Sequence, residues 1–142
     1  MNILPGLEST SSALAAEKVR LDIIGQNIAN AHTTRGPDGK PYARQMVSFE
    51  AKLMEVGTNE DGSKVMSTGV QVKSIDSDPT AGIIINNPGH PDADEDGNVL
   101  MPNVNLTHEM VDMIAASRSY EANLQVVRTA KQMAQQALRI GK

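Results

Sequence analysis

Residues 105–140 read NLTHEMVDMIAASRSYEANLQVVRTAKQMAQQALRI. Apolar residues recur in this stretch at the spacing of an α-helix. One row holds Leu106, Met113, Tyr120, Val127 and Ala134, and the next holds Met110, Leu124 and Leu138. Asn105 can cap the helix, Glu109 suits its positive N-terminal end, and Gly141 can stop it. The pattern predicts one helix of roughly 54 Å at ~1.5 Å per residue, so we expect an elongated molecule.

The N-terminal region predicts a second helix, from Ile3 to about Asn30. Four of its apolar residues recur every seven positions, as in a coiled coil: Leu7, Leu14, Leu21 and Ile28. Gly36-Pro37 prevents the helix from continuing. Thr10 and Glu17 interrupt the neighbouring row, so we expect this helix to be weak in isolation.

Between the two helices the pattern changes to short extended runs separated by turn residues. The predicted strands are Tyr42–Phe49, Val70–Ile75, Ile83–Ile85 and Asn98–Met101. The sequence thus predicts an α+β fold. We expect residues 1–32 and 103–142 to form long terminal helices that pair as an antiparallel coiled coil. We expect residues 33–102 to form a small β lobe inserted between them.

Composition excludes several classes of function. The 142 residues include three aromatic side chains, no Cys and a net charge of -4. Disulfides, thiolate metal sites and Cys nucleophiles are therefore excluded. The interspersed charges argue against a nucleic-acid or anionic-membrane surface. Neither a cleaved secretory signal nor a membrane span is expected, because no long apolar run occurs.

An acidic segment, Asp92-Ala93-Asp94-Glu95-Asp96-Gly97, matches the start of an EF-hand calcium loop. Asn103 stands where that loop needs a bidentate Glu, and Pro88-Gly89-His90-Pro91 cannot be its incoming helix. A tight turn whose carboxylates bond local backbone N–H groups is favoured instead. A calcium-regulated module remains the alternative.

No motif of catalysis is present. His32, His90 and His108 lie in separate segments without zinc-site spacing. The chain also lacks a nucleophile elbow, a P-loop and a dinucleotide-binding motif. We therefore expect neither an enzyme nor a bound cofactor or metal.

Two features bear on contacts with other proteins, and one of them favours such contacts. Asn27 and Asn30 share one helical face near the end of the helix. Asn tolerates the left-handed conformation that ends helices and can bond terminal backbone groups, so capping is favoured over direct contact with a partner. The long helix carries more apolar surface than one partner helix can cover, including Ile114, Val126 and Met133. This surplus favours lateral assembly over an isolated monomer.

The sequence resembles a known family over nearly its whole length. Residues 25–34, GQNIANAHTT, resemble the N-terminal signature of bacterial flagellar rod and hook proteins. Residues 88–97, 101–105 and 109–123 read PGHPDADEDG, MPNVN and EMVDMIAASRSYEAN, and this combination is similar to proximal-rod proteins.

The resemblance implies a non-enzymatic subunit of the basal-body rod, the drive shaft that carries motor torque across the periplasm. It implies helical assembly with itself and other rod subunits, contact with the motor ring and the more distal rod, and passage through the flagellar type III export apparatus without signal cleavage. The expected interface residues are Leu7, Leu14, Leu21, Ile28, Met113, Tyr120, Leu124 and Val127, with Asn27 and Asn30 shaping the turn out of the first helix. A soluble coiled-coil adaptor is a second alternative.

Overall fold

A computed structural model describes residues 4–58 and 62–140. The elements are α1 (Leu4–Ala29), β1 (Gln45–Thr58), β2 (Lys64–Ser77), β3 (Ile84–Asn86), β4 (Asn98–Leu100) and α2 (Leu106–Ile140). The predicted α+β class is confirmed, as are the end of the first helix near Asn30 and the extent of the second. The expected start at Ile3 and stop at Gly141 lie outside the described residues.

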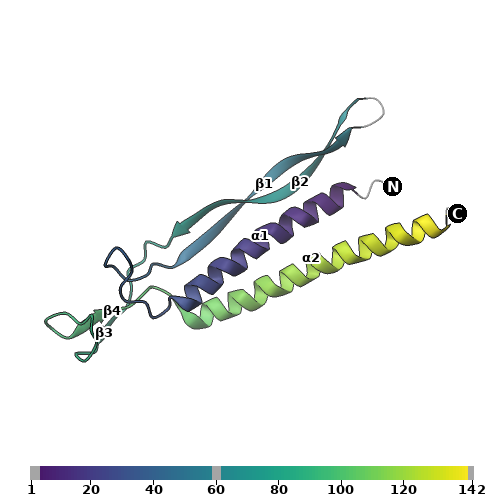
Figure 1. The fold of residues 1–142 in the computed structure, drawn as a ribbon. Coiled ribbons are helices and arrows are strands. Elements are labelled where there is room, and N and C mark those ends of the chain that lie inside the picture. The colour runs from purple at the N-terminus through teal and green to yellow at the C-terminus, as the bar shows by residue number, and fades with distance from the viewer. Residues whose placement is uncertain (1–3, 59–61, 141–142) are drawn as a thin grey trace.

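The elements form an elongated arrangement of three rods (Figure 1). α1 lies between the β1–β2 hairpin and α2, and it contacts both. Within residues 4–58 and 62–140, no Cα atom of α2 comes within 8 Å of β1 or β2. α1 and α2 run in opposite directions, so the start of α1 and the end of α2 lie at one end of the molecule, and the small β3–β4 hairpin lies at the other.

The buried core contains few large apolar side chains. The apolar side chains that are buried in the described part of the chain are Ala16, Ile23, Ile24, Ala31, Val99, Ala116 and Ala130. Most of these are alanines, which let backbones approach closely but remove little apolar surface from water.

The predicted strands Tyr42–Phe49 and Val70–Ile75 are wrong in length and start. β1 begins at Gln45, and its antiparallel pairing with β2 runs from Gln45↔Ser77 to Thr58↔Lys64. Burial alternates along the far half of β2, where Val65, Ser67 and Gly69 are the covered positions. Two of these three residues are not apolar side chains, so the sequence lacks the apolar alternation that marks a half-buried strand. The lobe is also two separate two-stranded sheets, β1–β2 and β3–β4.

The shorter hairpin lies close to its prediction. β3 covers Ile84–Asn86 in place of Ile83–Ile85, and β4 ends at Leu100, one residue before the expected Met101. Shifts of this size are ordinary at strand ends.

One backbone approach sets β2 against α1. Gly69 is buried, and a Cβ atom there would lie 2.8 Å from the Ser12 Oγ atom of α1. The same Ser12 hydroxyl accepts a 3.0 Å hydrogen bond from the backbone N–H of Val70. The absence of a side chain at Gly69 thus lets the strand backbone bond directly to the helix.

Candidate subunit interface

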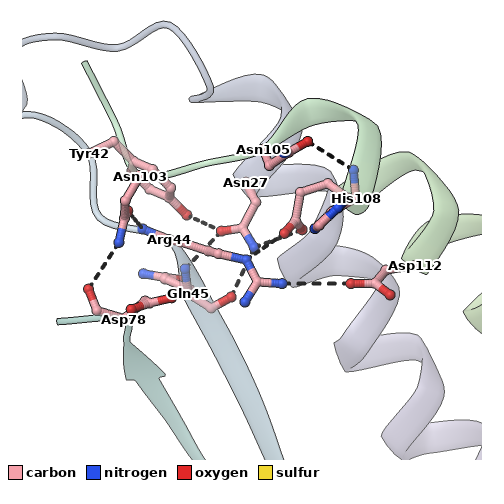
Figure 2. Close-up of polar contacts among 10 residues, drawn as sticks. Asn27, Tyr42, Arg44, Gln45, Asp78, Asn103, Asn105, His108 and Asp112 are labelled. Atoms are coloured by element: carbon pink, nitrogen blue, oxygen red, sulfur yellow. Dashed lines mark hydrogen bonds and ion pairs between the residues drawn. The ribbon is translucent and has the colours of Figure 1, made fainter. Parts of the chain in front are cut away.

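A buried polar junction joins α1, the start of β1 and the first turns of α2 (Figure 2). At its centre is the Asn27 amide, only 1% exposed. Its Nδ2 group donates to the Gln45 carbonyl at 2.9 Å and to Glu109 Oε2 at 3.0 Å. Its Oδ1 atom accepts from the Tyr42 hydroxyl and the Gln45 N–H, both at 2.9 Å. All four hydrogen-bonding positions of this amide are therefore used.

Glu109 supplies the buried charge of the junction and is 0% exposed. Arg44 Nε donates to its other oxygen, Oε1, at 2.6 Å. Arg44 Nη2 also lies 3.6 Å from Oδ2 of Asp112, which is on the next turn of α2. Because both carboxylate oxygens have partners, the cost of burying this charge is offset within the protomer.

Asn103 connects the same junction to the end of the β1–β2 hairpin. Its Oδ1 atom accepts from the backbone N–H of Arg44 at 2.7 Å. Its Nδ2 group donates to the carbonyls of Asp78 and Thr80 at 3.2 and 2.9 Å. The junction therefore fixes the angle at which the hairpin leaves the helix pair.

The predicted cap of α2 is confirmed. Asn105 Oδ1 accepts from the backbone N–H of His108 at 3.2 Å, as an N-cap side chain does. Glu109 follows in the first turn, but its carboxylate bonds Asn27 and Arg44, so its part is larger than the predicted interaction with the helix dipole.

Two pKa values in this region depart from their ordinary values. Burial, and then the charge of Glu109, raise the pKa of the Tyr42 hydroxyl above 10.0. Hydrogen bonds from the side chain and backbone of Thr80 lower the pKa of Asp78, and Arg44 adds to this effect. In both cases the surroundings favour one protonation state. They favour the neutral phenol of Tyr42, which raises its pKa, and the charged carboxylate of Asp78, which lowers its pKa.

Nine of the ten predicted interface residues are half-buried in the protomer: Leu7, Leu14, Leu21, Ile28, Asn30, Met113, Tyr120, Leu124 and Val127. The tenth, Asn27, is buried. The residues of this set come from both helices and follow their length, and only Asn27 belongs to the polar junction. That the other nine residues contact a second subunit stays a prediction.

The left-handed conformation expected of Asn27 and Asn30 is wrong, because no described residue other than glycine has a positive φ. The expected bond to a terminal backbone group is confirmed for Asn30, which donates to the Gln26 carbonyl at 2.9 Å and also accepts from the Thr33 hydroxyl at 3.2 Å. These bonds shape the turn that leaves α1.

α2 has an inner and an outer face. Along the inner face, Glu109, Met113, Ala116 and Tyr120 follow one another at alternating intervals of four and three, and Ser119 beside them donates to Glu17 of α1 at 3.1 Å. The large apolar residues exposed on α2 are Leu106, Met110, Val111, Ile114, Val126, Met133 and Leu138. The predicted surplus of apolar surface on α2 is therefore confirmed, because α1 leaves much of this surface uncovered.

The acidic segment 92–97 forms the predicted tight turn. Asp94 Oδ1 accepts from the backbone N–H groups of Asp96 and Asn98 at 3.0 and 2.7 Å, and Gly97 has a φ of 76°. Asp92 accepts from the Thr34 hydroxyl at 2.8 Å. Across residues 4–58 and 62–140, no group of three or more His, Asp or Glu side chains is placed to hold a metal ion.

The histidines lie apart from one another. His32 and His108 are exposed, and His90 Nδ1 accepts from the backbone N–H of Asp92 at 3.1 Å.

The described helices include none that is long and apolar enough to cross a membrane.

Arg44, Asn103 and the tie between Asn27 and Glu109 were missed by the sequence reasoning. One signal was available for Glu109, because it continues the row of Met113 and Tyr120 that faces α1. A charge on a buried helix row calls for a cationic or amide partner. Nothing in the spacing of residues identified Arg44 as that cation.

Two family models match the chain at its ends. One, described as flagella basal body rod protein, matches residues 7–37, and the other, described as flagellar basal body rod FlgEFG protein C-terminal, matches residues 95–140. These segments contain α1 from Leu7 onward and the whole of α2.

Curated relatives match over the full length. The flagellar basal-body rod proteins FlgC of Yersinia enterocolitica and Borreliella burgdorferi are 40% and 39% identical, covering 99% of this chain and 99% and 98% of their own lengths. The FlgC protein of Bacillus subtilis is 37% identical over 100% of both chains. The chain therefore belongs to the FlgC family of flagellar basal-body rod proteins.

Proposed function

We propose that this structural rod subunit assembles helically through its terminal helices into the shaft that transmits motor torque across the periplasm. The family is one of structural proteins of the basal-body rod and not of enzymes. The comparisons lend no support to a calcium-regulated module or to a soluble coiled-coil adaptor.

The exposed area of the chain carries this proposal. The protomer exposes 9949 Å². A compact monomer of 15.2 kDa would expose about 7,100 Å². The excess is comparable to the area that obligate protein interfaces bury, and part of it is the apolar outer face of α2. Neighbouring subunits would cover this surface.

The interface that we propose follows from the half-buried rows on both helices. α1 and α2 pair as an antiparallel coiled coil, and Leu7, Leu14, Leu21 and Ile28 of α1, with Met113, Tyr120, Leu124 and Val127 of α2, remain open to a neighbour on one side. Asn27 and Asn30 act indirectly, because their hydrogen bonds fix where α1 ends. The β1–β2 hairpin lies outside the helices and keeps neighbours in register.

We extend the proposal to the partners. The chain contacts itself and other rod subunits, the motor ring at the base of the rod and the more distal rod proteins, and it reaches them through the flagellar export apparatus. The exposed apolar residues of α2 support this, since a chain that completes its packing only in the rod can be delivered unfolded.

The test is a pair of charged substitutions on α2. Leu124→Asp and Val126→Asp are expected to abolish swimming and rod assembly while the protein is still made and exported. Leu124 is half-buried, and Val126 is 54% exposed in the protomer, so only a neighbour would bury the new carboxylate of Val126→Asp. Burying an unpaired carboxylate costs several kcal/mol.

Glu121→Gln is the matched control, because Glu121 is exposed on the same helix and surface substitutions change stability by under ~0.5 kcal/mol. Swimming, secreted protein and isolated basal bodies would be scored for each variant. Normal swimming and complete rods with both aspartate variants would show that α2 is not an assembly face.

A further inference from the structure

The methionine sulfurs are the side-chain atoms of this chain that two-electron oxidants attack most readily. The sequence has eight methionines and neither Cys nor Trp, so no thiol competes for an oxidant. Four methionines are among the large apolar side chains exposed in the described part of the chain: Met46, Met66, Met110 and Met133. These four thioethers are open to a dissolved oxidant before the chain meets a neighbouring subunit.

The two exposed methionines of the long hairpin lie beside charged side chains. Across the register of β1 and β2, Met46 is paired with Asp76 and Met66 is paired with Glu55, so each shares a face with a carboxylate. Glu55 also forms a 2.8 Å ion pair with Lys64, which lies two residues before Met66 on the same strand face. A more polar sulfur is tolerated in such surroundings, because they are themselves polar and exposed.

The two exposed methionines of α2 lie in apolar patches instead. Ile114 follows Met110 by about one turn of the helix. Met133 follows Val126 by seven residues, which is just under two turns, so each pair shares one side of α2. Both methionines are 54% exposed, and Ile114 and Val126 are exposed as well. These patches belong to the apolar surface that α1 leaves uncovered and that the proposed function assigns to a neighbouring subunit.

Oxidation by a peroxide would make these patches polar. A lone pair of the sulfur forms an S–O bond while the O–O bond of the peroxide breaks, so the sulfur loses the two electrons that the peroxide gains. With hydrogen peroxide, the departing hydroxide takes the proton of the transferred oxygen and leaves as water. The product is methionine sulfoxide, which is polar where the thioether was apolar. A contact that buries the new oxygen without a hydrogen-bond donor costs free energy.

We propose that Met110 and Met133 are oxidation sites whose state decides whether the subunit enters the rod. The oxidant is hydrogen peroxide or an organic hydroperoxide, and it acts on the chain before assembly. Thioethers at these positions pack against a neighbour, whereas a sulfoxide at either position keeps the subunit out. The inference rests on the proposed function, because only a neighbouring subunit removes these two sulfurs from water.

Matched substitutions at one position test the effect of polarity. Glutamine is polar and close to methionine sulfoxide in size, whereas leucine is apolar and cannot be oxidised in this way. Both are good helix formers, so neither is expected to unfold α2. We expect Met133→Gln to lower the number of complete basal bodies per cell by about fivefold or more relative to Met133→Leu, because only the amide loses its hydration at the contact. The same result is expected for Met110→Gln relative to Met110→Leu.

Met66→Gln and Met66→Leu are the control pair. Met66 is an exposed methionine with charged neighbours, so the two variants should agree within about twofold.

A pulse of hydrogen peroxide tests the oxidation itself. Cells making the wild-type chain would be compared with cells making the double variant Met110→Leu with Met133→Leu, each against its own untreated culture, while rods are forming. Peroxide damage to other proteins is common to both cultures. We expect the wild type to lose about threefold more new basal bodies than the double variant, and sulfoxide at Met110 and Met133 to be about tenfold scarcer in rods than in unassembled chains by peptide mass spectrometry.

Equal numbers of basal bodies for the glutamine and leucine variants at both positions would overturn the inference, as would equal peroxide sensitivity of the two cultures. Chains with sulfoxide at Met110 or Met133 that enter rods as readily as unmodified chains would do the same. If one of these occurs while Val126→Asp still abolishes rod assembly, the oxidation sites are wrong and the proposed function stands. Complete rods with both Leu124→Asp and Val126→Asp would instead overturn the proposed assembly through α2.

Discussion

Asn27 shows how one side chain can decide the geometry of a thin protomer. It sits where α1, β1 and α2 meet, and its amide makes four hydrogen bonds, all of them to groups outside its own helix. Three of the four hold Tyr42 and Gln45 at the entry to β1. Leucine could occupy about the same space but could not satisfy Glu109 or the backbone of Gln45. The motif that carries the family resemblance thus has a structural reason at this position.

Removing this amide should destabilise the folded chain. We expect Asn27→Ala to lower the free energy of unfolding by about 2–4 kcal/mol, because it leaves the buried Glu109 carboxylate and the Gln45 backbone short of partners. Asn30→Ala is the control, since its bonds are exposed or half-buried, and we expect a loss of about 1 kcal/mol or less. Urea unfolding measures both. Equal losses would mean that the junction does not govern stability.

Tyr42 gives the junction a dependence on pH. Burial and Glu109 raise its pKa above 10.0, so the folded state holds the phenol proton more tightly than the unfolded state does. This contribution is fully present below about pH 10, the ordinary pKa, and is lost as pH rises through the folded pKa.

We therefore expect the free energy of unfolding to fall more steeply above pH 10 in the wild type than in Tyr42→Phe. The chain has two tyrosines, so an ultraviolet titration of Tyr120→Phe reports Tyr42 alone. Titration of Tyr42 at or below its ordinary value in the folded Tyr120→Phe variant would contradict the assignment.

At the scale of elements, the helices could be predicted from sequence and the long hairpin could not. The ends of α1 and α2 follow from local signals, such as the Asn105 cap and the Gly36-Pro37 break, that act without tertiary contacts. The outer half of the β1–β2 hairpin has no such signal. One face of β2 is covered there, but the covered positions include Ser67 and Gly69, so no apolar pattern marks the strand. The pairing with β1 shifts register between Ser48 and Phe49 and between Glu55 and Gly57.

The polar junction could be predicted only in part, for a related reason. Asn27 and Glu109 could be recognised as polar residues on helix faces that pack, but their partners come from a connecting segment that no periodicity describes. Arg44 and Asn103 meet because the hairpin returns beside the start of α2, which is a property of the tertiary structure. Long-range pairing of this kind leaves no trace in local spacing.

At the scale of the whole molecule, the packing is uneven along the helix pair. Buried and fully bonded groups gather where α1 ends and α2 begins, whereas the seam farther on is held by alanines and by Glu17, one oxygen of which is buried with no hydrogen bond in the described chain. Regions with few buried apolar contacts open at low free energy. The junction end should therefore be the stable end of the isolated subunit.

Hydrogen exchange on the dilute monomer tests this gradient. We expect amides of residues 112–120 to be protected at least tenfold more than those of residues 128–139, because the first set directly follows Glu109, which is held by Asn27 and Arg44, and the second set lies far from these bonds. In isolated rods the difference should largely disappear, since neighbours would cover the outer face of α2. Uniformly strong protection along α2 in the monomer would show that α1 alone stabilises the whole helix. The exposed apolar residues of α2 would then not need a neighbouring subunit for the helix to be stable.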